Sequence, residues 1–154
     1  MGSFTQFAYH VVFGTKYRRP AITASLCRQL YEYMGGTIRA KNGHLIETGG
    51  VEDHVHLLVN LPASIAVSDS IRDIKANSSR WVNGRSKLNL PFQWQKGYGA
   101  FTVSYSQLDV VRRYIHTQQE HHRQKTFQEE YMALLTRHGI VFEQEHLFEG
   151  EYSG

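Results

Sequence analysis

The sequence predicts an α+β fold of the ferredoxin-like type, a split β-α-β arrangement in which an antiparallel sheet carries helices on one face. Segments with strand character and segments with helical spacing follow one another in the order β-α-β-β-α-β, which is the first observation behind this prediction. The second is the length of 154 residues, which suits a single domain. We expect one domain over residues 1–154, with its core in about residues 4–139 and a tail at 140–154. Further helical segments predict C-terminal helices added to a sheet whose second face is free for a ligand.

Composition and spacing predict the first strand and the first helix. Residues 4–13 are rich in aromatic and β-branched side chains, which favour a strand, and a basic loop follows at residues 14–20. Thr23 can cap a helix that runs to about Ala40. Apolar side chains recur at helical spacing within that segment, at Leu26, Leu30, Tyr33, Met34 and Ile38.

The middle of the chain predicts a hairpin, a second helix and a fourth strand. Residues 44–48 and 54–61 have strand character, and the Gly-Gly pair at residues 49–50 predicts a tight turn between them. Residues 64–82 place their apolar side chains on one side of a helix. Residues 92–105 then return to strand character.

The last third of the chain predicts two more helices and a tail. Ser106 can cap a helix over residues 107 to about 123. Another helix is expected from about residue 126 to 138, where Gly139 stops it. Residues 140–154 are acidic, and we expect them to be strand-like at first and then loose.

Charge and cysteine content limit the classes of function. The net charge is +3 and the isoelectric point is near 9.0, with basic groups clustered at residues 16–19, 72–85 and 112–125. Such clusters are typical of a surface that meets phosphates, although a solvated charged face explains any one of them. The single Cys27 excludes an internal disulfide and a thiolate-rich structural zinc site. Because no apolar run approaches the roughly 20 residues of a membrane span and no signal-peptide pattern opens the chain, we expect a cytoplasmic protein without a membrane partner.

The His54-Val55-His56 run is the strongest indication of chemistry. A strand turns alternate side chains to the same side, so both imidazoles should face one way while Val55 faces the core. Two neutral imidazoles on a rigid strand form half of a divalent-metal site. A hydrogen-bonded polar pair at the surface is the alternative.

A second set of polar residues lies in the predicted helix after the fourth strand. Tyr114, Gln118 and His121 fall on one stripe at about 100° per residue, while His116 points away from it. The stripe brings a phenol beside an amide oxygen. Val110 and Val111 lie on or near the same stripe, so burial of Tyr114 in the core is the alternative interpretation.

Four segments, in order, resemble the HUH single-tyrosine transposases of the insertion-sequence 200/605 type and their relatives, the REP-associated tyrosine transposases. These segments are residues 9–20, residues 53–59, residues 94–101 and residues 114–122. One departure is Val51-Glu52, where many relatives have Met-Pro. It alters the turn before the strand and touches neither histidine.

The resemblance implies a transposase that cleaves and rejoins single-stranded DNA at the hairpin-forming ends of a mobile element. Tyr114 would be the nucleophile of this DNA strand transferase, and the intermediate would be a 5′-phosphotyrosine. His54, His56 and Gln118 would hold a divalent cofactor, Mg²⁺ or Mn²⁺. The resemblance also implies a homodimer in which each active site combines the His pair of one subunit with the Tyr114 helix of the other. Such an enzyme would associate with the nucleoid when it is bound to DNA.

Two further groups of residues are interpreted as DNA contacts. In the basic loop, Lys16, Arg18 and Arg19 offer charge to the DNA backbone, while Tyr17 could stack on an unpaired base. His122 and Arg123 are expected at phosphates. His121 is a possible additional site residue, which could serve as a ligand, activate Tyr114 or contact DNA.

Two other functions fit the same sequence. A domesticated relative could grip hairpin DNA or RNA without cutting it, but such a protein has no physical need for the full set of histidines, tyrosine and glutamine. A metal-dependent hydrolase of small phosphate esters would need a pocket, whereas the basic loops indicate an extended polymer.

Overall fold

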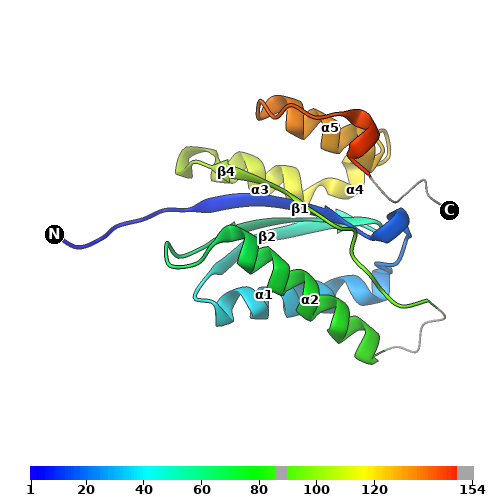
Figure 1. Ribbon diagram of the computed structural model, residues 1–154, viewed down its shortest axis with the longest axis horizontal. Helices are drawn as coiled ribbons and strands as arrows, with labels where there is room; N and C mark the ends of the chain where they lie inside the picture. The colour runs from blue at the N-terminus through cyan, green and yellow to red at the C-terminus, as the bar shows by residue number, and fades with distance from the viewer. Residues whose placement is uncertain (86–89, 149–154) are drawn as a thin grey trace.

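The computed structural model describes residues 1–85 and 90–148 and has three layers, with the sheet in the middle (Figure 1). Its four strands are β1 (Ala8–Gly14), β2 (His44–Val51), β3 (His54–Asn60) and β4 (Gly99–Val103). They lie in the order β2-β3-β1-β4, and every neighbouring pair is antiparallel. This is the strand order of the split β-α-β fold, so the predicted fold class is confirmed.

One face of the sheet is covered by α1 (Ala24–Ala40) and α2 (Val67–Arg85). Thr23 caps α1 as predicted, because its side chain accepts a hydrogen bond from the backbone N–H of Leu26 at 3.3 Å. The main core lies between these helices and the sheet. Its fully buried members include Val11, Leu30, Met34, Ile38, Val55, Leu57, Ile71 and Ile74.

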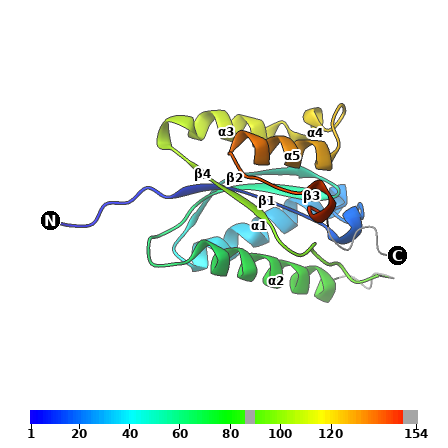
Figure 2. The ribbon, with the colours of Figure 1, turned by 45° about the horizontal axis from the view of Figure 1, so that its top comes forward.

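The other face is covered by α3 (Leu108–His116), α4 (Gln118–His121) and α5 (Phe127–Arg137), as Figure 2 shows after a turn of the view. The sequence predicted these C-terminal helices but left this face free. In the structure they pack on it through two smaller clusters, one around Phe127 and Leu134 and one around Ile115. A ligand on this face must therefore share it with the helices.

The hairpin turn is not where the Gly-Gly pair predicted it. Gly49 and Gly50 lie inside β2, and the turn is made by Glu52 and Asp53. A Cβ added at Gly49 would lie 2.0 Å from the carbonyl oxygen of Ile115, so glycine is needed here because the backbone of α3 approaches the strand. The glycine thus marks a packing contact between a strand and a helix.

The predicted helix over residues 107–123 is shorter and broken. A 3₁₀ turn, η2 (Tyr105–Gln107), precedes α3, and the helix is interrupted at Thr117 before α4 begins. The hydroxyl of Thr117 donates to the carbonyl of Arg113 at 3.0 Å, a local hydrogen bond that competes with the regular helix. The α5 prediction is confirmed, because Thr126 and Glu129 form a capping box and Gly139 follows with a φ of 70°.

Two predicted strand segments are wrong in part. Residues 92–98 are outside β4, and Trp94 makes only an isolated bridge with Thr15. Residues 140–148 form no strand; they contain the turn η3 (Gln144–His146) and end at Phe148, which packs on Phe127. The rest of the predicted tail, residues 149–154, lies outside the described residues. Within the described part of the chain, no helix combines the length and the apolar character needed to cross a bilayer.

Candidate active site

His54 and His56 lie together on β3 and face the layer formed by α3, α4 and α5. Both side chains are fully buried, and their ring centroids are 5.1 Å apart. Val55 and Leu57 point to the opposite side, into the main core. The alternation predicted from the sequence is therefore present, and the interpretation as an exposed surface pair is excluded.

Tyr114 and Gln118 meet these histidines within one chain. The Oε1 atom of Gln118 lies 3.2 Å from Nε2 of His54, and the Tyr114 ring centroid lies 5.9 Å from that of His56. Because Gln118 begins α4, the break at Thr117 turns its amide toward the histidines while Tyr114 stays on α3. The backbone of α3 lies close to Gly49, and this close contact sets the distance of Tyr114 and Gln118 from the sheet.

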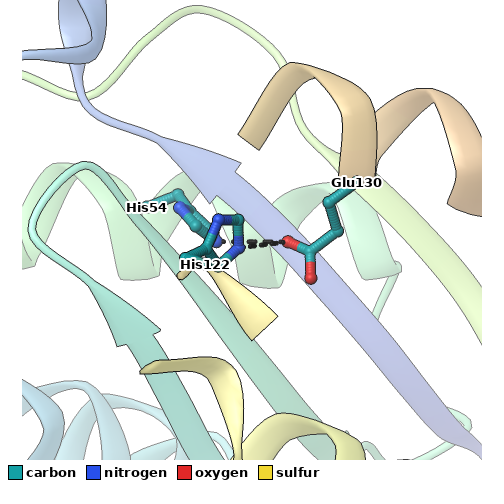
Figure 3. A group of neighbouring side chains, drawn as sticks. All are labelled: His54, His122 and Glu130. Atoms are coloured by element: carbon teal, nitrogen blue, oxygen red, sulfur yellow. Dashed lines mark hydrogen bonds and ion pairs between the residues drawn. The ribbon is translucent and has the colours of Figure 1, made fainter. Parts of the chain in front are cut away.

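Glu130 on α5 is the central residue of the site, and the sequence analysis missed it. One carboxylate oxygen, Oε1, lies 3.2 Å from Nε2 of His54, 2.9 Å from Nε2 of His56 and 3.0 Å from Nε2 of His122. Figure 3 shows how His54 and His122 point at this carboxylate from two different elements. A signal was available, because Glu130 lies on the apolar stripe of its helix, where a carboxylate needs buried partners.

The second oxygen of Glu130 faces the proposed nucleophile. Oε2 accepts a short hydrogen bond from the hydroxyl of Tyr114 and another from Nε2 of Gln118 at 2.8 Å. The side chain of Glu130 is only 4% exposed, so these bonds form away from water. One carboxylate therefore links the histidine cluster to the tyrosine.

Hydrogen bonds to the Nδ1 atoms orient the rings of the two strand histidines. Nδ1 of His54 lies 2.7 Å from the carboxylate of Asp53, and Nδ1 of His56 lies 2.7 Å from Nε2 of the buried His10. Metal-binding histidines are usually fixed in this way through the nitrogen that does not bind the ion. Neither Asp53 nor His10 was predicted as a site residue, although Asp53 directly precedes the His-x-His run.

Burial and neighbouring charges set the protonation of the histidines. Burial lowers the pKa of His54, but hydrogen bonds and charges from Asp53 and Glu130 outweigh it and raise the pKa to about 9. For His56, burial dominates and lowers the pKa to about 4, despite the hydrogen bond to Glu130. Without a metal ion, His54 is therefore an imidazolium near neutral pH and His56 is neutral.

The same balance applies to the acidic groups. Burial disfavours the ionised form of Glu130, but hydrogen bonds from His122, His54 and His56 outweigh it and hold its pKa well below the usual range. Burial, and next Glu130, raise the pKa of Tyr114. The phenol is therefore protonated in this arrangement, with its proton directed at Glu130.

The donor set fits a divalent cation. Ligand atoms of His54, His122 and Glu130 all lie within 4.8 Å of one another, and the nitrogens converge on the position of one carboxylate oxygen. Imidazole nitrogens together with amide and carboxylate oxygens are ligands for divalent first-row metals. A nucleophilic hydroxyl beside such a cluster can attack a phosphorus atom that an ion holds in place.

The structure places His121, His122 and Arg123 differently from one another. His122, expected at DNA, is turned inward and is only 9% exposed. His121 does not join the cluster; its ring lies 4.7 Å from that of Tyr114, and its Nε2 is 3.0 Å from the hydroxyl of Thr117. Arg123 is exposed.

The basic loop lies at the His54 end of the sheet. The side chain of Thr15 donates to the carbonyls of Arg19 and Asp53, at 2.7 and 3.1 Å. These hydrogen bonds hold the loop next to Asp53, and therefore next to His54. Tyr17, 41% exposed, lies between Lys16 and Arg19, with the Arg19 guanidinium 5.0 Å from its ring centroid. Tyr17 and Arg18 have φ values of 58° and 52°, a left-handed conformation that costs on the order of 1 kcal/mol or more per non-glycine residue.

Sequence comparison identifies similar proteins. The family described as "Transposase IS200 like" matches residues 3–118. A transposase for insertion sequence element IS200 from Salmonella typhimurium is 29% identical over 100 residues, which are 62% of this chain and 66% of that protein's length. The ISDra2 transposase TnpA from Deinococcus radiodurans is 27% identical over 125 residues, which are 77% of this chain and 89% of that protein.

Two solved structures share the fold. A Deinococcus radiodurans protein described as a transposase superposes with a TM-score of 0.63 at 23% identity, covering 77% of this chain and 95% of the other. A REP-associated tyrosine transposase bound to a REP hairpin gives a TM-score of 0.57 at 14% identity, covering 76% of this chain and 72% of the other. At these identities the likeness concerns the fold.

Proposed function

This chain belongs to the IS200-like transposase family, and on that premise we propose that it cleaves and rejoins single-stranded DNA at the hairpin-forming ends of a mobile element. The observation that carries the proposal is the contact of the Tyr114 hydroxyl with Glu130, whose other oxygen lies among three histidine nitrogens. A nucleophile and a metal-binding set are thereby joined in one buried cluster.

In the proposed reaction, Tyr114 attacks the scissile phosphodiester and forms a 5′-phosphotyrosine. A bond forms between the phenolic oxygen and phosphorus, and the bond from phosphorus to the 3′-oxygen breaks. The phenol proton leaves along its hydrogen bond to Oε2 of Glu130, and the departing 3′-oxygen takes up a proton from water. Reversal by another 3′-hydroxyl rejoins DNA without an external energy source.

We propose that His54, His56 and Gln118 hold the divalent ion, Mg²⁺ or Mn²⁺, on which this reaction depends. When bound, the ion would offset the charge of the scissile phosphate and orient it for attack. Asp53 and His10 keep the strand histidines aimed at the centre. Protonated His54 must lose its proton before it can act as a ligand.

The DNA partner is proposed from the basic loop and from one structural neighbour. That neighbour is bound to a REP hairpin, which supports hairpin DNA as the ligand here. Lys16 lines a hollow of about 600 Å³ together with Lys96 and Trp94, so positive charge and an aromatic ring belong to the same hollow. We propose that single-stranded DNA runs from this hollow past Tyr17, and that Arg123 contacts phosphates beyond the site.

A homodimer also remains a proposal. The resemblance implied that the site is shared between subunits, but Tyr114 contacts Glu130, which bonds His56, within the same chain. Sharing would therefore require α3, α4 and α5 to change places between subunits. Such an exchange is not needed to bring the site residues together.

End-labelled DNA tests the proposed reaction. Single-stranded oligonucleotides from the flanks of the gene, carrying a label at either end, would be incubated with the protein and Mn²⁺ and run on a denaturing protein gel. We expect the 3′-end label to move with the protein, because a 5′-phosphotyrosine retains the 3′ part of the strand. The 5′-labelled fragment should be released, and chelator should stop both events.

Tyr114→Phe should remove the adduct and leave DNA binding nearly unchanged, because binding rests on many phosphate contacts. Tyr105→Phe is the matched control, since Tyr105 is 79% exposed just before α3. Hairpin binding by the wild-type chain with no adduct on any flank would instead support the binding-only alternative.

A further inference from the structure

A third histidine is arranged like the two on the strand. Nδ1 of His122 lies 2.7 Å from the carbonyl oxygen of Lys125, so this ring, too, is anchored through Nδ1. Its Nε2 lies 3.0 Å from Glu130 and 3.1 Å from the Oε1 atom of Gln118. All three imidazoles thus present Nε2 to the same point and use Nδ1 for support. Histidines that only pack or bind DNA have no need for this common orientation.

Glu130 occupies that point with a single oxygen. Three nitrogens lie between 2.9 and 3.2 Å from Oε1, which is hydrogen-bond distance. The carboxylate reaches the point from α5, the histidines come from β3 and the end of α4, and the side chains of Glu130 and His56 are 4% and 0% exposed. A carboxylate in this place can serve as an anionic ligand for an ion that enters the cluster.

We propose that His122 and Glu130 are ligands of the same divalent ion as His54 and His56, and that the completed centre prefers a first-row transition ion such as Mn²⁺ to Mg²⁺. This inference rests on the metal-dependent function proposed above and names the ligands and the ion class of that site. Both residues lie beyond the segment, residues 3–118, that matches the family.

The ion preference follows from the donor atoms. Two imidazoles and an amide supply two nitrogens and one oxygen, and with His122 and Glu130 added, nitrogen still outnumbers oxygen, by three donors to two. Mg²⁺ favours oxygen ligands and keeps much of its water, whereas imidazole nitrogen binds transition ions more strongly. The Glu130 carboxylate adds a negative charge, which strengthens the binding of any divalent cation. The attraction between the two charges offsets the cost of burying the cation.

Direct metal binding tests the proposal without DNA. Mn²⁺ would be titrated into the full chain after chelation and dialysis, and free Mn²⁺ would be followed by its electron paramagnetic resonance signal. We expect Glu130→Gln and His122→Asn each to weaken Mn²⁺ binding by about tenfold or more, because the first replaces an anionic ligand with a neutral amide and the second removes an imidazole nitrogen. Glu120→Gln and His121→Asn make the same chemical changes outside the cluster and should bind within about twofold of wild type.

Competition tests the ion class. A tenfold molar excess of Mg²⁺ should leave most of the Mn²⁺ bound to the wild-type chain. If either buried variant fails to fold, paramagnetic broadening of nuclear magnetic resonance signals in the wild-type chain tests whether Glu130 binds the ion. With ¹³C-labelled glutamate, substoichiometric Mn²⁺ should broaden the carboxylate signal of Glu130, assigned with Glu130→Asp, before that of any other glutamate.

Each outcome decides between the inference and the function on which it rests. Unchanged or tighter Mn²⁺ binding by Glu130→Gln would show that the carboxylate only fills the cluster, and unchanged binding by His122→Asn would remove the third histidine. Displacement of Mn²⁺ by equimolar Mg²⁺ would overturn the ion preference. In these cases, metal-dependent adduct formation by the wild-type chain would leave the proposed function intact. A wild-type chain that binds no Mn²⁺ and forms its adduct in chelator would overturn both.

Discussion

At the scale of single residues, the sequence was informative where local geometry decides the outcome. The two-residue period of a strand is sufficient to place His54 and His56 on one face. Helical spacing is sufficient to place Tyr114 near Gln118, even though the helix breaks between them. Glu130 could not be assigned in this way, because its role depends on how α5 packs against β3. Glu130 and His56, which it contacts, are 74 positions apart in the sequence.

The unusual protonation of the cluster predicts a pH dependence of stability. The pKa of His54 is raised to about 9, from an ordinary value of 6.5. Its contribution to the free energy of unfolding is therefore fully present below pH 6.5 and is lost as the pH rises toward 9. The pKa of His56 is lowered to about 4, so its contribution is present above pH 6.5 and is lost as the pH falls toward 4. From these two groups alone, the metal-free protein should be most stable near pH 6.5.

Urea denaturation in chelator measures the His54 contribution. Between pH 6.5 and 9 we expect the wild-type chain to lose on the order of 2 kcal/mol more than Asp53→Asn, because an amide cannot stabilise the imidazolium. Comparison with this variant removes the contributions of other groups that titrate in the same range. Asp69→Asn, at an exposed position on α2, should follow the wild-type curve. Parallel curves for the wild-type chain and Asp53→Asn would contradict the contribution of Asp53 to the raised pKa of His54.

At the scale of elements, the positions of strands and helices were more predictable than their contacts. A Gly-Gly pair between two strand-like segments is a typical turn signal, so the sequence favoured a turn at residues 49–50. The glycine at position 49 instead leaves room for the backbone of α3. Contacts of this kind involve residues far apart in the chain, and a local pattern cannot distinguish them from turns.

Gly49→Ala should separate Tyr114, the proposed nucleophile, from the histidines without changing any site residue. The added Cβ would lie 2.0 Å from the carbonyl oxygen of Ile115, so α3 must shift and carry Tyr114 with it. We expect adduct formation to slow by about 100-fold or more, since a displacement of about 1 Å can have that effect, and stability to fall by about 1–3 kcal/mol. The proposed binding of DNA through the basic loop should persist.

Gly84→Ala is the matched control, because nothing lies within 4 Å of a Cβ added there. It should form the adduct at the wild-type rate and be at least as stable, since alanine favours a helix. Stability would be measured by denaturation and the rate by single-turnover adduct formation. A wild-type rate for Gly49→Ala would show that the height of α3 over the sheet does not position Tyr114.

At the scale of the whole molecule, one chain brings together a site that spans residues 54–130. The strand, both short helices and α5 each supply a part, and the basic loop lies at the same end of the sheet as His54. The resemblance predicted the parts from the strand, the short helices and the basic loop, but not Glu130 on α5, and it placed the tyrosine helix on the histidines of another subunit. Which chain supplies the helix is a property of the assembly, and the sequence pattern is the same in either case.

Mixing two inactive variants distinguishes these arrangements. Tyr114→Phe and His56→Ala would be combined under conditions in which subunits exchange, and adduct formation would be measured. From the contacts within one chain we expect no recovery, since every site keeps one defect. If helices exchange between subunits, half of the randomly formed dimers are mixed and each has one intact site, so about a quarter of wild-type activity should return. That recovery would establish the shared site.

Covalent capture of DNA by Tyr114 can be tested most directly by mass spectrometry. The wild-type adduct, formed with Mn²⁺, would be trimmed with nuclease, digested with trypsin and sequenced by fragmentation. We expect one modified peptide, beginning at Tyr114 after cleavage behind Arg113, with a nucleotide joined through its 5′ phosphate to the tyrosine oxygen. DNA that is cut while Tyr114 stays unmodified, or an adduct on another residue such as Tyr17, would contradict the assignment of Tyr114 as the nucleophile.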